Sequence, residues 1–171
     1  MNKTAKSILT AIAVIMLGVF LAAPSSARST WDTSPVQVTR HVTPTPKIVD
    51  LRVGQHSTYD RVVIDMSGPI PGYRISYVKA LYYDGSGETV PLRGARFIKI
   101  TLTPASAHDS QGHSVYQGPR LTQYAMPTLR GAAFTGDFEG VVSFGISLSH
   151  LKSFRVFELH APNRLVIDLH H

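Results

Sequence analysis

The feature that most constrains the fold of this chain is a seven-residue pattern that occurs twice. The copies are Asp60–Met66 (DRVVIDM) and Asn163–Leu169 (NRLVIDL). Each is a strand-sized run of aliphatic residues, bracketed by an arginine and an aspartate four positions apart. Because side chains alternate along a strand, the aliphatic residues share one face, and the arginine and aspartate share the other. The repeat therefore predicts two half-buried strands of one all-β domain.

The arginine and aspartate of one copy cannot pair with each other, because four residues of extended chain separate them by about 13 Å. They can pair between copies. If the copies are antiparallel neighbours with their central valines opposite each other, Arg61 faces Asp168. Asp65 then faces Arg164, and the four residues have a structural role. The alternative places the copies in different sheets, where each charged side chain finds a partner among its own neighbours.

Residues 1–27 have the layout of a secretory signal peptide, with a basic start, an apolar run and small residues before Arg28. The apolar run, Ile8 to Leu21, has 14 residues, and a membrane-spanning helix needs about 20. We therefore expect a secreted or cell-envelope protein without a transmembrane segment in the mature chain. An uncleaved membrane anchor is the alternative.

Cysteine is absent from the sequence, so the exported domain must be stable without disulfides. Thiolate nucleophiles and cysteine-type zinc sites are excluded for the same reason. Without the two lysines of the signal peptide, 15 basic residues stand against 11 acidic ones, a net charge of +4. Such a mild charge, without basic runs, does not fit nucleic-acid binding, although it favours an acidic envelope polymer.

Residues 28–46 contain three prolines and no sustained hydrophobic period, which predicts a flexible Pro-rich spacer. From residue 47 to residue 171, short alternating runs recur between turn residues, and no helical period appears. Seven or eight short strands at this spacing predict an all-β domain, a β-sandwich of two facing sheets. The expected strands cover residues 49–53, 60–66, 73–77, 98–102, 142–148, 154–159 and 165–169.

The alternating pattern lapses between Pro104 and Gly140, and a loop of this length in a compact domain is often functional. Aromatic faces stack on sugar rings, and the arginine fork holds carboxylates. We therefore predict ligand-binding residues in this stretch. They are Tyr116, Arg120, Tyr124, Arg130, Phe134 and Phe138. In the alternative interpretation, these aromatic residues form a small satellite core beneath the loop.

Motifs for metal binding and for catalysis are missing. The histidines lack the spacing of zinc ligands, so we expect no metal and no cofactor. Those considered are His108 and His113 near Asp109, and the terminal His170–His171. No Gly-x-Ser-x-Gly motif occurs, since residues 145–149 read GISLS. A triad can still assemble from distant residues, which keeps a hydrolase as a minor hypothesis.

Residues 47–169 resemble the AMIN domain, and more closely the AMIN-like domains of secreted actinobacterial proteins. The resemblance rests on the motifs Tyr59–Asp65, Pro71–Tyr73, Gly136–Gly140 and Pro162–Asp168. It implies a β-sandwich and a role at the cell envelope, because AMIN domains accompany cell-wall amidases and secretin pores and localise them, notably by binding peptidoglycan. It brings no catalytic residue. Because no amidase or secretin module follows, we expect a free-standing domain.

The sequence thus predicts a secreted, non-catalytic binding module at the cell envelope that recognises peptidoglycan or another wall polymer. One alternative is a secreted protein-interaction module without affinity for the wall. A hydrolase is the other.

Overall fold

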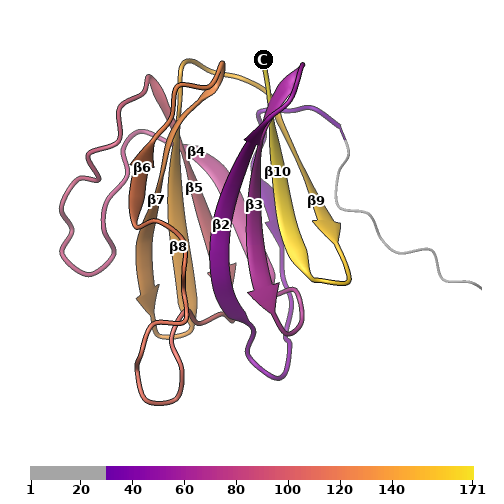
Figure 1. Ribbon diagram of the computed structural model, residues 1–171, viewed down its shortest axis with the longest axis vertical. Coiled ribbons are helices and arrows are strands. Elements are labelled where there is room, and N and C mark those ends of the chain that lie inside the picture. Colours follow the sequence, from indigo (N-terminus) through magenta and orange to yellow (C-terminus); the bar gives the residue numbers. More distant parts are fainter. Residues whose placement is uncertain (1–29) are drawn as a thin grey trace, which may run out of the picture.

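The computed structural model describes residues 30–171, which form two facing antiparallel sheets and no helix (Figure 1). The prediction of an all-β sandwich is confirmed, with ten strands rather than seven or eight. The larger sheet has the order β1 (Val36–Val38), β4 (Gly72–Val78), β5 (Arg96–Thr103), β8 (Val141–Leu148), β7 (Leu129–Phe138) and β6 (Leu121–Gln123). The smaller sheet has the order β2 (Lys47–Gln55), β3 (Tyr59–Ser67), β10 (Arg164–His170) and β9 (Phe154–Leu159). The predicted signal peptide, residues 1–27, lies outside the described residues.

The two copies of the repeat are neighbouring antiparallel strands, β3 and β10, with Val63 opposite Val166. This is the neighbour arrangement anticipated from the sequence, and the alternative with the copies in different sheets is wrong. The register places Arg61 opposite Asp168, and the Arg61 Nε atom donates to Asp168 Oδ1 over 2.7 Å. The first of the two expected cross-strand ion pairs is therefore present.

The second expected ion pair does not form, although Asp65 and Arg164 are opposite each other in register. Asp65 instead accepts hydrogen bonds from Arg52 of the adjacent β2, with 2.8 Å between Arg52 Nη2 and Asp65 Oδ1. Arg164 Nε donates to the carbonyl oxygen of Pro162 over 3.1 Å. The prediction of an Asp65–Arg164 pair was wrong because β3 has a second neighbour that supplies a competing arginine.

Aliphatic side chains of the repeat face the core between the two sheets. Ile64 of β3 and Ile167 of β10 are fully buried. They belong to one hydrophobic cluster with Ile75, Ile98 and Phe144 of the larger sheet. Both faces needed for a sandwich core are thus supplied by strands with alternating patterns, as the sequence indicated.

The structure also corrects the interpretation of residues 28–46 as a flexible spacer. Val36–Val38 forms the edge strand β1 and pairs with β4, and both valines pack against the core. Earlier in the segment, Asp32 exchanges two backbone hydrogen bonds with Phe154 of β9, at 3.0 and 2.8 Å. A three-residue strand is too short to show a period, and prolines are tolerated at a sheet edge. Residues 28 and 29 fall outside the described part.

The long stretch between Pro104 and Gly140 contains two strands that the sequence pattern did not show, β6 and the ten-residue β7. β7 does not alternate because both of its faces are covered. Its inner face meets the sandwich core, and Ala133 on its outer face packs with Leu81, Val90 and Leu92. Leu92 lies so close to β7 that only small residues fit beneath it, since a Cβ atom added at Gly131 would lie 2.7 Å from Leu92 Cδ2.

Candidate functional site

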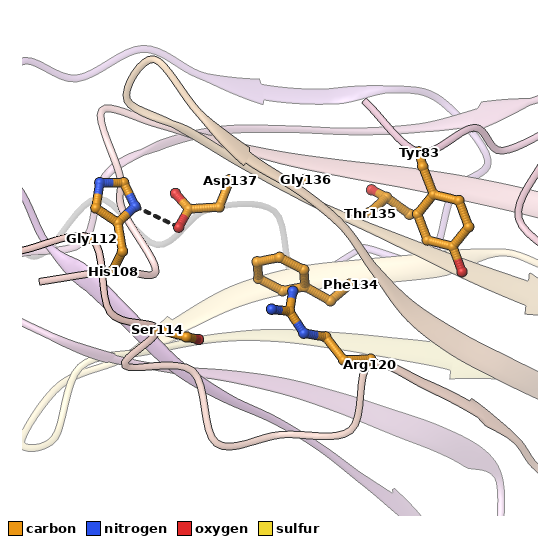
Figure 2. A pocket seen from close by; sticks show the side chains of 9 residues that line it. All are labelled: Tyr83, His108, Gly112, Ser114, Arg120, Phe134, Thr135, Gly136 and Asp137. Atoms are coloured by element: carbon orange, nitrogen blue, oxygen red, sulfur yellow. Dashed lines mark hydrogen bonds and ion pairs between the residues drawn. The ribbon is translucent and has the colours of Figure 1, made fainter. Parts of the chain in front are cut away.

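A hollow of about 530 Å³ lies where the second half of β7 meets the connection from β5 to β6 (Figure 2). We call it the β7 groove. Its lining combines a cation, a histidine, a carboxylate, hydroxyl groups and aromatic rings on a small area. The lining residues are Tyr83, His108, Gly112, Ser114, Arg120, Phe134, Thr135, Gly136 and Asp137.

A hydrogen-bonded histidine and aspartate form one end of the β7 groove, joined by the dashed line in Figure 2. The atoms His108 Nδ1 and Asp137 Oδ2 are 2.7 Å apart. The His108 carbonyl accepts a hydrogen bond from Lys47 Nζ over 2.6 Å, which ties the histidine backbone to β2. Asp137 is near the end of β7, after an irregularity in register between Phe134 and Gly136. The pair is therefore fixed from two sides of the groove.

Two residues that line the β7 groove, Thr135 and Asp137, each have a side-chain oxygen atom without a hydrogen-bond partner among the described residues. Thr135 Oγ1 and Asp137 Oδ1 are buried, and neither forms a hydrogen bond with another residue in the described part of the chain. A buried polar atom without a hydrogen bond is costly, so native structures leave few of them. Two residues of the groove lining thus carry an oxygen atom whose hydrogen-bonding capacity the described residues leave unused.

Arg120 supplies the positive charge of the groove. Its guanidinium carbon is 4.7 Å from the centroid of the Phe134 ring, so that the cation rests on the aromatic face (Figure 2). The Phe134 ring is buried against Tyr116 and Phe144 and cannot stack on a sugar itself. No carboxylate among residues 30–171 pairs with Arg120, so its planar fork is available to a carboxylate ligand.

The six residues predicted to bind a ligand do not form one site. Arg120 and Phe134 meet in the β7 groove, whereas Tyr124 and Arg130 line a second hollow near the start of β7. Phe138 follows Asp137 and is 70% exposed.

Tyr116 belongs to the core rather than to a surface. It is buried among Phe134 and Phe144, and its hydroxyl donates to the Pro119 carbonyl over 3.3 Å. For Tyr116 and Phe134 the packing agrees with the satellite-core alternative, except that the rings join the main core. Burial raises the pKa of Tyr116.

His113 and His171, two other histidines, contact different aspartates outside the β7 groove. His113 is exposed and interacts with Asp109, 3.3 Å from Nδ1 to Oδ2. The ring of His171, in contrast, is held by the buried Asp60, with 2.9 Å between Nε2 and Oδ1. No three His, Asp or Glu side chains converge as metal ligands within residues 30–171.

Sequence reasoning missed His108, Thr135 and Asp137 as groove residues. The sequence indicates His108 only as a candidate metal ligand, and 29 positions separate it from Asp137. Nothing local in the sequence indicates that these two side chains meet. The one available signal was the motif Gly136–Gly140, which supported the family resemblance and contains the aspartate.

A model of the AMIN-like domain family matches residues 46–171. No curated protein matches the sequence significantly. In the described part of the chain, no helix has the length and apolar character to cross a membrane.

Proposed function

The chain belongs to the AMIN-like domain family, and from this membership we propose that it is a non-catalytic binding module that recognises peptidoglycan or another wall polymer. The family associates the chain with the cell wall in general terms. An exported, envelope-located protein is part of the proposal, since the signal-peptide pattern of residues 1–27 and the family agree with it.

The observation that carries the proposal is the pair of buried acceptor atoms beside an arginine without a carboxylate partner. Asp137 Oδ1 and Thr135 Oγ1 suit a sugar hydroxyl or an amide N–H, and Arg120 suits a carboxylate. Peptidoglycan carries all three groups close together, because amide-bearing sugars are joined to short peptides that end in carboxylates. A neutral polysaccharide would leave the arginine unused.

Binding rather than cleavage is favoured by the surroundings of His108. A nucleophile needs a base within hydrogen-bond reach. Ser114 lines the same groove, yet its hydroxyl is directed at the Tyr116 carbonyl, 3.5 Å away. Among the described serines, none is hydrogen-bonded to the His108 ring. The histidine serves instead to hold the Asp137 carboxylate in position.

Sedimentation with purified insoluble cell wall tests the proposal. We expect the purified protein to sediment with the wall, and Arg120→Gln and Asp137→Asn to weaken this by about tenfold each, as for charged hydrogen bonds. Arg74→Gln is the matched control, because Arg74 lies on β4 and donates to Gln37. Thermal unfolding of each variant separates lost binding from lost folding.

Each outcome bears on a different hypothesis. No sedimentation of the native protein would contradict wall binding and favour the protein-interaction module. Sedimentation that persists unchanged in both groove variants would show that another surface binds the wall. Release of soluble wall fragments, abolished in Asp137→Asn, would establish a hydrolase.

A further inference from the structure

A second hollow, of about 570 Å³, lies near the first residues of β7, at the opposite end of this strand from the β7 groove. We call it the arginine hollow. Loops that precede β5 and β7 and follow β8 form its walls. The lining residues are Arg93, Gly94, Ala95, Gln123, Tyr124, Ala125, Arg130 and Ser149, none of which is acidic.

The two arginines of this hollow have unused guanidinium groups. The hydrogen bonds of Arg93 and Arg130 involve only their backbone atoms within the described residues. Several arginines elsewhere in the domain are neutralised, since Arg40 is paired with Glu158 and Arg52 with Asp65. Two unneutralised cations that line one hollow repel each other, and an anion between them relieves this repulsion.

The walls of the arginine hollow are held by hydrogen bonds that leave both arginine side chains free. Gln123 accepts from the Arg93 backbone N–H over 3.3 Å and donates to the Pro91 carbonyl over 3.0 Å. Tyr124 N–H donates to the Arg130 carbonyl over 2.7 Å. At Gly94 the chain runs so close to β8 that an added Cβ would lie 2.9 Å from the Leu148 carbonyl oxygen. The backbone of the site is thus preorganised, which lowers the cost of binding.

We propose that the arginine hollow binds a phosphoryl group, as inorganic phosphate, a phosphomonoester or a phosphodiester. A carboxylate offers two oxygen atoms in one plane, and a single arginine fork satisfies both. The oxygen atoms of a phosphoryl group are arranged tetrahedrally, so two forks approaching from different sides can each engage a different edge. This site is separate from the β7 groove and does not depend on wall binding.

Titrations of the full chain with inorganic phosphate, glycerol phosphate and acetate at constant ionic strength test the proposal. NMR of the backbone amides of Gly94 and Ala95 reports on this hollow directly. We expect saturable shifts with both phosphates and none with acetate. Arg93→Gln and Arg130→Gln should each weaken phosphate binding about tenfold or more, while Arg74→Gln and Arg120→Gln should leave it unchanged.

Three results would overturn the assignment. Acetate that saturates the same amides at equal concentrations would refute the preference for phosphoryl groups. Phosphate binding that survives both Arg93→Gln and Arg130→Gln would place the site elsewhere. Shifts that rise without saturation up to high phosphate would mean that no site exists. Arg93 lies on an exposed loop, so Arg93→Gln keeps the test valid even if Arg130→Gln unfolds the strand.

Discussion

Arg61 of β3 and Asp168 of β10 face each other across neighbouring strands, and the guanidinium of Arg61 binds the fully buried carboxylate of Asp168. Arg155 of β9 reaches the same carboxylate, 2.8 Å from Nη2 to Oδ2. One aspartate therefore connects three strands of the smaller sheet. Aromatic rings cover the two arginines, since the Arg155 guanidinium lies over Trp31 and that of Arg61 lies over Tyr59 and Phe157.

Asp168→Asn should destabilise the domain by about 3–5 kcal/mol, because it leaves two partly buried arginines without their carboxylate. Denaturant unfolding measures the change. Asp65→Asn is the matched control on the same sheet face. Its partner Arg52 is 55% exposed, so we expect a loss of about 0–1 kcal/mol. Equal losses in the two variants would contradict the central role of Asp168.

Exchange of the charges, Arg61→Asp with Asp168→Arg, should not restore stability. An arginine at position 168 would face Arg155, which already approaches this position from β9. If Arg61 and Asp168 formed a pair without a third partner, the double variant would recover most of the stability lost in either single variant. Denaturant unfolding that shows full recovery would mean that Arg155 contributes little.

Ile64→Ala and Ile167→Ala should each cost about 2–5 kcal/mol, since both side chains are fully buried between the sheets. Leu151→Ala serves as the control because Leu151 is 53% exposed, and its loss should stay near 0.5 kcal/mol or less. Thermal and denaturant unfolding both report the effect. An unchanged midpoint in either isoleucine variant would show that the face is not part of the core.

Removal of residues 30–40 should reduce the free energy of unfolding by about 1–3 kcal/mol and so lower the unfolding midpoint. The deletion removes β1, the bonds of Asp32 to β9 and the contact of Trp31 with Arg155. Trp31 is the single tryptophan of the chain, so its fluorescence follows this segment directly. In the intact protein, its emission should change together with global unfolding. A separate, earlier change would mean that the segment detaches on its own.

Ionisation of the buried tyrosines should make stability decrease above about pH 10, where free tyrosine ionises. Burial raises the pKa of Tyr73 and of Tyr116, and in Tyr73 the nearby Glu158 adds to the effect. The folded state therefore keeps phenol protons that the unfolded chain releases, and each proton retained costs stability as the pH rises. Tyr116→Phe should reduce the alkaline loss. Unfolding curves of the native protein and of Tyr116→Phe at mildly and strongly alkaline pH provide the comparison.

The repeat made β3 and β10 predictable together with their register. Each copy has a clear alternation, and the matching arginine and aspartate fix which residues are opposite. β7 was not predictable in the same way. Its glycines and alanines reflect the distance to Leu81 and Leu92, which depends on how the segment between β4 and β5 folds back over the sheet.

The residue types of the candidate site were predictable from the sequence, but the contacts between them were not. Arginine and aromatic residues in a long, irregular stretch indicated a surface, and Arg120 does line the β7 groove. The contact of His108 with Asp137, however, arises only when the connection after β5 packs on the end of β7. Composition identifies the types of side chain that gather in such a stretch, and tertiary packing decides which of them meet.

The position of β10 in the middle of the smaller sheet also determines when this sheet can form. β2 and β3 are made more than 90 residues before β10, which is the second neighbour of β3 in the sheet (Figure 1). Until residues 164–170 emerge from the ribosome, the hydrophobic face of the β2–β3 hairpin has no neighbour on one side, and pairing across such a sequence distance is slow. A growing chain therefore cannot complete the smaller sheet before residues 164–170 have been made.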